Sequence, residues 1–373
     1  MEKHLHIVCH DVPYPVDYGG VFDQFYKIKT LFKEDIKIHL HCFDYGRGQQ
    51  KKLEEYCFEV HYYERQEGHR GLSLSLPYIV CSRANPLLLD NLLKDNHPIL
   101  FEGIHTTYYL YEGYFKNRKT FVRLHNVEYK YYYQLSRQSR SPFKKVFFWN
   151  ESRLLKKFEK VIANQTMIIA LSSSEAAWYQ NKFQSVNVKY LPVFIGWEFP
   201  LCKEGIGTFC LYHGNLSVPE NEQVAEWLLE KVFNDLQMPL VVAGKNPPSS
   251  LAKLAHANPN TCIVSNPSES EMQDLIQKAQ INILPSFTET GIKFKLLNAV
   301  FCGRHILVNE EMTKSTDVET ACHIASTAAA FKSVLVQLYR RPFGDEEINL
   351  REHLLHQFYN NIKHARQLIE WIY

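Results

Sequence analysis

Two lysines lie at the predicted start of a helix, where positive charge is unfavourable. Lys293 and Lys295 follow Gly291 at the start of the apolar helical pattern Ile292–Cys302. The N-terminus of a helix carries free N–H groups and the positive end of the helix dipole, so lysines there are unfavourable unless an anion is bound. The apolar run Ile281–Leu284, a predicted buried strand, ends just before this loop. The stretch therefore predicts an anion site, suited to a diphosphate, at the carboxyl end of a strand.

A second group of polar side chains follows the predicted strands 98–101 and 120–124. Ligands of open α/β sheets bind at the carboxyl ends of the strands, so this group is a candidate site. The simpler alternative is that His125 and Asn126 cap the next helix, since Asn is a favoured cap residue. The group comprises Glu102, His105, Arg123, His125, Asn126 and Glu128.

Glycines mark three further turns between a predicted strand and the residues that follow it. Gly19 and Gly20 precede a helix that is predicted to begin near Val21, and Gly214 follows the predicted strand 208–213. Lys245 comes directly after a third such turn, in the run GKNPP, where it would lie beside a phosphate. A glycine pair alone is usually only a turn, so these residues are weak evidence without further support.

Strands and helices alternate along the whole chain, which predicts parallel, doubly wound sheets and an α/β fold. The alternation stops at 195–207, a stretch with Gly, Pro and charges but no periodicity, and then restarts. We therefore expect two Rossmann-like domains, 1–194 and 208–345, joined by the linker 195–207. The last stretch, 346–373, is predicted to be helical, with an apolar face on which isoleucines and a leucine recur one heptad apart: Ile348, Leu355, Ile362 and Ile369.

These patterns together resemble the retaining, family-4-type glycosyltransferases, of the polysaccharide-biosynthesis subgroup. The subgroup reads approximately G-x-K/R-x-K-x-L-E-A at the first site, and this chain matches it except at Asn298, where the family has Glu. The matching residues are Gly291, Lys293, Lys295, Leu297 and Ala299. R-x-H-N-x-E at 123–128, G-K-N-P-P at 244–248 and Gly214 with Pro219 resemble further motifs of the subgroup. The resemblance implies the two-domain GT-B fold, with the domains facing a cleft and a C-terminal helix that crosses back to the first domain.

The resemblance also implies a role for each candidate residue. His125 and Glu289 would contact the donor sugar and support catalysis, and Asn298 would hold the donor ribose without the charge of the usual Glu. Glu102, His105 and Glu128 would lie on the acceptor side. The donor diphosphate would contact Gly19, Gly20, Gly214, Lys245, Gly291, Lys293 and Lys295. No D-x-D motif for a divalent ion is present, so we expect neither a metal nor another cofactor besides the nucleotide-sugar substrate.

The segment 129–160 is basic and aromatic. It carries nine Lys or Arg against Glu151 and Glu159, with nine Tyr, Phe or Trp interleaved. Solvated helices with one buried face are the first interpretation, and peripheral contact with anionic lipid is the second. Binding of single-stranded nucleic acid would also use a basic aromatic surface, but no nucleic-acid fold motif accompanies it, so we expect no nucleic-acid partner.

Composition limits the class of protein. The chain has 373 residues, a formal net charge of +2 and a hydrophobic content of 45%, as expected for a globular protein of two domains. Its nine cysteines include no C-x-x-C pair and favour a reducing compartment, and its 17 histidines show no zinc-binding spacing. The first strand follows Lys3 directly, and no apolar run is long enough to span a bilayer. We expect a cytoplasmic protein, with peripheral contact at the inner membrane face as the alternative.

Three functions fit these patterns. The first is a retaining glycosyltransferase that moves a sugar from a nucleoside-diphosphate donor to a glycan or lipid-linked acceptor, in surface polysaccharide synthesis. The second is a degenerate, non-catalytic relative that binds a partner protein or a glycan, which Asn298 would favour. The third is a hydrolase or epimerase of nucleotide sugars, against which the acceptor-side residues argue.

Overall fold

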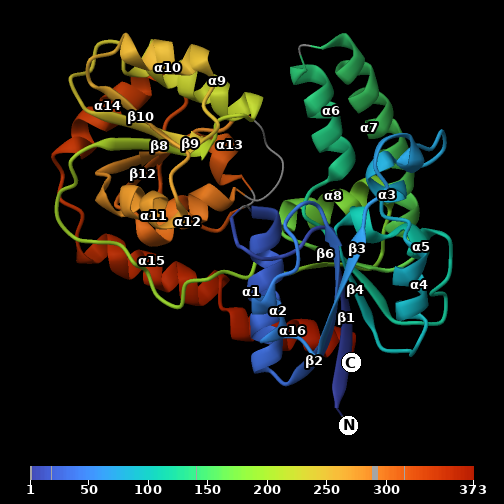
Figure 1. Ribbon diagram of the computed structural model, residues 1–373. Coiled ribbons are helices and arrows are strands. Elements are labelled where there is room, and N and C mark those ends of the chain that lie inside the picture. Colours follow the sequence, from blue (N-terminus) through green and yellow to red (C-terminus); the bar gives the residue numbers. More distant parts are fainter. Residues whose placement is uncertain (1, 18, 140, 288–292, 315) are drawn as a thin grey trace. The chain divides into compact units, whose positions relative to one another are not determined.

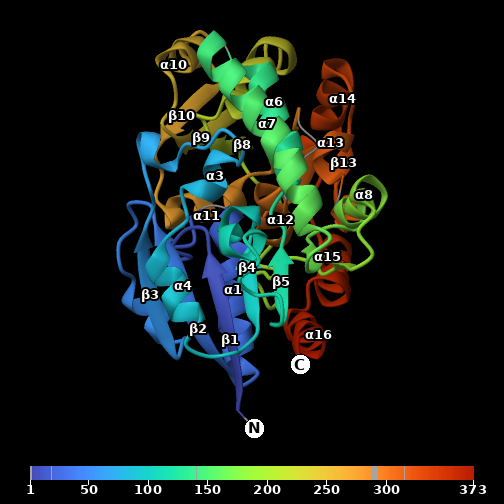
Figure 2. The ribbon, with the colours of Figure 1, turned by 90° about the vertical axis from the view of Figure 1, so that its right-hand side faces the viewer.

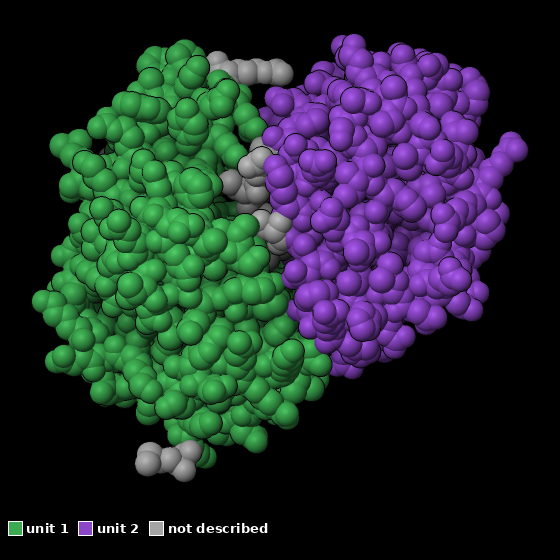
Figure 3. Space-filling model, turned by 180° about the vertical axis from the view of Figure 1, so that it is seen from behind, with its two compact units in different colours: residues 1–196, 290–292, 359–373 green, residues 197–289, 293–358 purple. Residues whose placement is uncertain are grey.

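The computed structural model describes residues 2–17, 19–139, 141–287, 293–314 and 316–373. These residues form two compact units, which Figure 3 distinguishes by colour. Unit 1 comprises residues 2–196 and 359–373, and unit 2 comprises residues 197–287 and 293–358. Each unit is built on its own sheet.

The sheet of unit 1 has seven strands, in the order β3-β2-β1-β4-β5-β6-β7, and every pairing is parallel. This order reverses direction between β1 and β4, which makes the carboxyl ends of these two strands the expected ligand-binding edge of the unit. The strands are β1 (Lys3–Cys9), β2 (Ile36–Asp44), β3 (Glu59–Glu64), β4 (Ile99–Glu102), β5 (Thr120–Arg123), β6 (Met167–Ala170) and β7 (Val188–Tyr190).

Helices cover both faces of this sheet (Figures 1 and 2). On one face, α1 and α16 pack on an apolar cluster that includes Phe25, Ile28 and Leu368, and on the other face α3, α4, α5, α7 and α8 contribute to a second cluster. The helices α6 and α7 form a hairpin. The bounds are α1 (Gly19–Lys33), α2 (Lys51–Glu54), α3 (Tyr78–Cys81), α4 (Pro86–Leu92), α5 (Tyr108–Tyr111), α6 (Glu128–Gln138), α7 (Pro142–Ile162), α8 (Ser173–Phe183) and α16 (Asn361–Ile372).

The sheet of unit 2 has six parallel strands, in the order β10-β9-β8-β11-β12-β13, so that its direction reverses between β8 and β11. The strands are β8 (Cys210–Asn215), β9 (Leu240–Lys245), β10 (Thr261–Ser265), β11 (Ile281–Ile283), β12 (His305–Val308) and β13 (His323–Ile324). The helices are α9 (Pro219–Trp227), α10 (Ser249–His256), α11 (Glu269–Lys278), α12 (Phe294–Cys302), α13 (Glu310–Thr313), α14 (Ala328–Tyr339) and α15 (Asp345–Phe358). The prediction of two doubly wound parallel sheets is confirmed.

The C-terminal helical stretch is divided into two helices, α15 in unit 2 and α16 in unit 1. The break at Tyr359 and Asn360 shifts the helical phase, so the predicted heptad face does not continue across it. Ile362 is 48% exposed, whereas Ala365, Leu368 and Ile372 are buried. The expectation that Ile362 shares the buried face is therefore wrong. Among the described residues, no helix combines the length and the apolarity that crossing a membrane requires.

Candidate functional site

A buried network of charges lies at the carboxyl ends of β4 and β5 in unit 1. Glu102, the last residue of β4, is fully buried, and its Oε2 accepts a hydrogen bond from His125 Nε2 at 2.9 Å. Lys27 Nζ on α1 lies 2.7 Å from Glu102 Oε1 and 2.9 Å from Asp23 Oδ2. Arg123, the last residue of β5, holds Asp23 through two bonds of 3.0 and 3.1 Å. The structure thus brings Glu102 and His125 together, as the sequence predicts, and adds Asp23 and Lys27.

The two carboxylates of this network stay ionised. Burial pushes the pKa of Asp23 upward, but Arg123 and Lys27 outweigh it and hold that pKa well below the usual range. The same balance, with Lys27 and the bond from His125, lowers the pKa of Glu102. Since the Glu102 carboxylate can only accept, Nε2 of His125 carries a proton, and Nδ1 is the nitrogen left for another partner. The arrangement can orient His125 toward a sugar hydroxyl and accept a proton from it.

Two more histidines complete the polar edge of unit 1. The ring centroids of His10 and His105 are 5.1 Å apart, and those of His10 and His125 are 5.2 Å apart. Burial lowers the pKa of His10 and of His105 well below the usual value, so both rings are neutral. Gly103 has a φ of +77°, and a Cβ there would lie 2.9 Å from His105 Nδ1. This turn between β4 and His105 therefore requires glycine.

Glu128 is the first residue of α6. It is only 2% exposed, and burial raises its pKa to about 8, with the hydrogen bond from Asn126 opposing the shift. Glu128 is therefore a buried, mostly neutral acid at pH 7. Gly19 and Gly20 are the first two residues of α1, the helix that supplies Asp23 and Lys27. The donor role of the glycines and the acceptor role of Glu128 stay predictions.

In unit 2, Lys295 lies at the carboxyl end of the sheet, near the point where the strand order reverses. Its Nζ donates to Asn221 Oδ1 at 3.1 Å and lies 5.2 Å from the centroid of the Tyr212 ring on β8. Asn221 Nδ2 in turn donates to the carbonyl of Asn215 at 2.9 Å. Asn215 is paired in register with Lys245, the exposed last residue of β9. These contacts connect the predicted phosphate-binding residues Lys295 and Lys245 along one edge.

An acidic side chain lies at the same edge. Glu220 Oε1, in the first turn of α9, accepts bonds from the Ser286 hydroxyl at 2.7 Å and from the Phe287 N–H at 3.1 Å. Burial lowers the pKa of Lys295 to about 8 and also lowers that of Lys293, while Glu220 opposes both shifts. Lys295 is therefore still mostly a cation at pH 7. Glu220 fixes the segment that follows β11 and balances part of the positive charge.

Two glycines of this edge leave little room for a side chain. A Cβ on Gly214 would lie 3.2 Å from the amide of Asn221, and a Cβ on Gly244 would lie 1.8 Å from the Gly214 carbonyl oxygen. Gly214 thus borders the side chain that holds Lys295, and its contact with the donor stays a prediction. Gly244 is needed for backbone packing.

The remaining candidates are on or before α12. Lys293 is the N-cap residue of α12, and Asn298 Oδ1 accepts a hydrogen bond from Gln273 Nε2 on α11 at 3.0 Å. The predicted residues Glu289 and Gly291 lie outside the described residues. Sequence reasoning missed Asp23 and Lys27, which a charged pair at i and i+4 within the apolar pattern of α1 could have indicated.

Comparison with known proteins identifies the second unit. Residues 207–341 match the family model "Glycosyl transferases group 1". The chain contains a group 1 glycosyltransferase domain. A protein of Klebsiella pneumoniae described as an uncharacterized 44.6 kDa protein in the cps region is 24% identical over 313 residues, which cover 79% of each chain.

Solved structures match the fold of the whole chain. TarM superposes with a TM-score of 0.72 at 10% identity, over 100% of this chain and 99% of TarM. Anabaena HepE, determined in complex with UDP and glucose, superposes with a TM-score of 0.65 at 11% identity, over 100% and 99% of the two chains. These likenesses confirm the GT-B fold that the motifs predict.

Proposed function

We propose that this chain transfers a sugar from a uridine-diphosphate donor to a hydroxyl of a glycan or lipid-linked acceptor, with retention of configuration, in surface polysaccharide synthesis. The group 1 domain and the cps-region relative support glycosyl transfer and its pathway. The UDP complexes of HepE and of a Staphylococcus aureus TarM variant suggest the nucleotide. The observation that carries the proposal is Lys295, held by Asn221 at the carboxyl edge of the sheet in the matched domain.

In this reaction the bond from the anomeric carbon to the diphosphate oxygen breaks, a bond to the acceptor oxygen forms, and the acceptor hydroxyl passes its proton to the departing diphosphate. Negative charge develops on the leaving diphosphate. Lys295, Lys293 and Lys245, together with the N-terminus of α12, would stabilise that charge without a metal ion. His125, oriented by Glu102, would contact the donor sugar, and the polar edge of unit 1 would bind the acceptor.

UDP affinity tests the donor site. Replacing Lys295 by Ala should weaken UDP binding by about 1–3 kcal/mol, because a charge-assisted hydrogen bond is lost. Lys253→Ala is the matched control, since Lys253 is an exposed lysine on α10 of the same unit. Calorimetry that finds equal UDP affinity in all three proteins would place the diphosphate elsewhere. Turnover of a panel of UDP-sugars, with and without acceptor glycans, then tests the transfer itself.

A second candidate function is a non-catalytic, glycan- or partner-binding relative. Glu220 and Asn298 favour it, because the first adds negative charge beside the expected diphosphate and the second removes the carboxylate that the family uses for the ribose. Asn298→Glu separates the two functions. In a working transferase it should tighten UDP binding by about 1 kcal/mol. In a degenerate protein neither form will bind UDP or a UDP-sugar.

The hairpin α6–α7 carries a surface that suits contact with anionic lipid, as the sequence suggests. Phe143 is 88% exposed, Val146 is 65% exposed and Trp149 is 46% exposed, on the side of α7 opposite its buried residues. Lys144 and Lys145, next to Phe143 in the sequence, are also exposed. Exposed aromatic residues next to lysines are typical of helices that bind at a lipid interface. We propose peripheral contact of this surface with the inner membrane face.

Vesicle co-sedimentation tests this contact. The chain should bind phosphatidylglycerol vesicles more strongly than phosphatidylcholine vesicles, and Phe143→Glu should reduce the bound fraction. Val186→Glu, at another fully exposed apolar position of unit 1, is the control. Equal sedimentation with both lipids, or no effect of Phe143→Glu, would exclude this surface as the membrane contact.

A further inference from the structure

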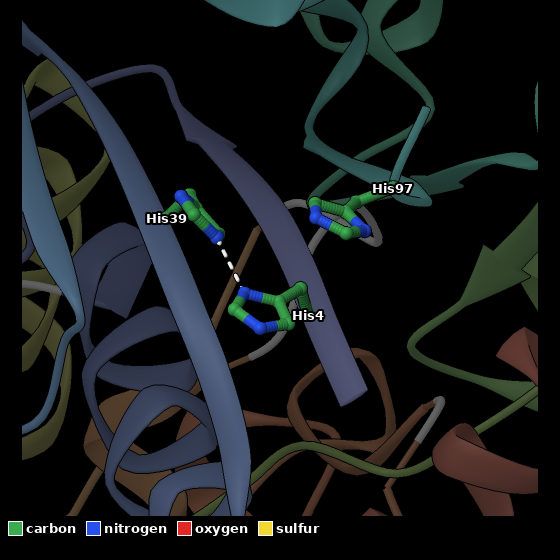
Figure 4. A group of neighbouring side chains, drawn as sticks. All are labelled: His4, His39 and His97. Carbon is green, nitrogen blue, oxygen red and sulfur yellow. Dashed lines mark hydrogen bonds between the residues drawn. The ribbon is translucent and has the colours of Figure 1, made fainter. Parts of the chain in front are cut away.

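Histidines line one face of the sheet of unit 1 near the amino ends of its strands. The register pairs His6 on β1 with His39 on β2, and pairs His41 on β2 with His61 on β3. Because alternate residues of a strand point to the same face, His4 lies on the same face as His6. His97 joins this group from the segment just before β4 (Figure 4).

The two inner histidines of this group, His6 and His41, use both of their ring nitrogens in hydrogen bonds within the protein. His6 Nδ1 lies 2.8 Å from His41 Nε2, and the other ring nitrogen of His6 lies 3.0 Å from Asp95 Oδ1. The second nitrogen of His41 bonds to the hydroxyl of Tyr63 at 2.8 Å. Every ring nitrogen of His6 and His41 therefore has a protein partner, and these rings serve the packing of the sheet.

The outer histidines differ, because one nitrogen from each of His4, His39 and His97 lies within 4.8 Å of the others. His4 Nδ1 and His39 Nε2 are 2.9 Å apart and share one proton. The ring nitrogens of His97 have no hydrogen-bond partner in the part of the chain that the structure describes. Three nitrogens bound to one tetrahedral ion at 2.0–2.1 Å would lie about 3.3 Å apart. The rings of His4 and His97 are stacked, with centroids 4.7 Å apart and planes inclined by 14°, so the His97 ring would have to turn to direct a nitrogen at a shared ion.

Neighbouring groups orient the three histidines. Glu59 Oε1 accepts from His39 Nδ1 at 2.5 Å, which turns Nε2 toward His4, as carboxylates do behind metal-binding histidines. Asp95 Oδ1 accepts the His97 backbone N–H at 2.9 Å, and the Tyr373 hydroxyl donates to the His4 carbonyl at 2.7 Å.

We propose that His4, His39 and His97 bind one divalent transition-metal ion of the Zn²⁺ class, with water as a further ligand. Imidazole nitrogens suit zinc, copper, nickel and cobalt, whereas magnesium and calcium prefer oxygen. The site lies at the amino ends of the strands, whereas the Glu102–His125 pair lies at the carboxyl ends. The ion would therefore join β1, β2 and the start of β4 rather than take part in sugar transfer, and the site is independent of the proposed function.

Metal titration of the untagged full-length chain tests this site. With Zn²⁺ against a chromophoric chelator, the wild type should take up one equivalent, and Co²⁺ should give the visible absorption of a tetrahedral site. His4→Gln and His97→Gln should each weaken Zn²⁺ binding about tenfold or more, and Glu59→Gln should weaken it about tenfold, since it orients a ligand. His256→Gln, an exposed histidine on α10, should leave binding unchanged.

Two measurements keep the test decisive. His4 and His97 are partly exposed, so their Gln variants should keep the far-ultraviolet circular dichroism of the wild type. Zn²⁺ should raise the Tm of the wild type, because an ion that binds only the folded chain stabilises it. A wild type that binds less than one equivalent, or shows no rise in Tm, would overturn the proposal. Variants that are folded and bind Zn²⁺ as tightly as the wild type would also overturn it.

Discussion

Single residues determine how closely the strands of unit 2 approach at the donor edge, and Gly244 is the most restrictive of them. A methyl group there would lie 1.8 Å from the Gly214 carbonyl oxygen, which is backbone and cannot rotate away. Gly244→Ala should lower the free energy of unfolding by about 1–3 kcal/mol, as overpacking does. Gly214→Ala is the comparison: its methyl group meets the Asn221 side chain, which can move, so it should weaken UDP binding more than stability. Urea unfolding and calorimetry measure the two effects.

Replacing Lys27 should strongly lower the free energy of unfolding of unit 1. Lys27 is fully buried between Asp23 and Glu102. Lys27→Met should lower the free energy of unfolding by about 3–5 kcal/mol, because it leaves a buried carboxylate without its cation. Lys29→Met, on the same helix at a partly exposed position, should change it by about 0.5 kcal/mol or less. Equal losses in chemical denaturation would mean that the network does not depend on Lys27.

The same residues show how far the sequence predicts the site. Glu102 and His125 each follow a predicted apolar strand, and His125 also belongs to a motif. Asp23 and Lys27 were not predicted, since an i, i+4 charge pair on a helix usually faces solvent, and only the packing of α1 on the sheet buries it. The histidine trio was also missed, because its members come together through strand register rather than through local spacing.

At the scale of elements, α6, α7 and α8 bury several acids that make stability depend on pH. Burial raises the pKa of Glu159 to about 8, although the hydrogen bond from Tyr179 opposes the shift. Burial also raises the pKa of Glu128 to about 8. The folded chain therefore keeps protons that the unfolded chain releases above about pH 4.5. The contribution of these protonated acids to the free energy of unfolding is therefore fully present below about pH 4.5, and it is lost as the pH rises toward 8. Buried neutral histidines have the opposite effect, because they lower the stability as the pH falls, but they act only below about pH 6.5.

Glu159→Gln should isolate this effect between pH 6.5 and 8. Glu159 accepts from the Tyr129 N–H and from the Tyr179 hydroxyl. Gln can keep the first bond through its side-chain oxygen, and its amide can donate to the Tyr179 oxygen in place of the second. The wild type should lose stability relative to the variant as pH rises, by at most about 1.4 kcal/mol per pH unit. Glu112→Gln, at an exposed position of unit 1, should show no such trend. Parallel stability curves for Glu159→Gln and the wild type would show that Glu159 is ionised throughout.

At the scale of the whole molecule, the sequence predicts both sheets correctly but not the end of the chain. Apolar runs such as Ile36–Phe43 identify buried strands because both faces of a parallel sheet are covered. The heptad pattern at the C-terminus was misleading, since Asn360 accepts from the Lys363 N–H and starts a new helix in a different phase. Unit 1 is therefore completed by residues far away in the sequence, and α16 packs on α1 beside the first strands.

The packing of α16 on unit 1 can be tested by mutation. Leu368 is 1% exposed in the apolar cluster with Ile28 and Leu5, so Leu368→Ala should lower the free energy of unfolding of unit 1 by about 2–5 kcal/mol. Ile362→Ala removes an apolar side chain of similar size from the same helix, but at 48% exposure it should cost about 0.5 kcal/mol or less. UDP affinity should be unchanged in both variants, because α16 belongs to unit 1 and Lys245 and Lys295 belong to unit 2. Equal destabilisation by the two changes would contradict the phase of α16, and a loss of UDP binding in folded Leu368→Ala would show that UDP binding depends on the packing of unit 1.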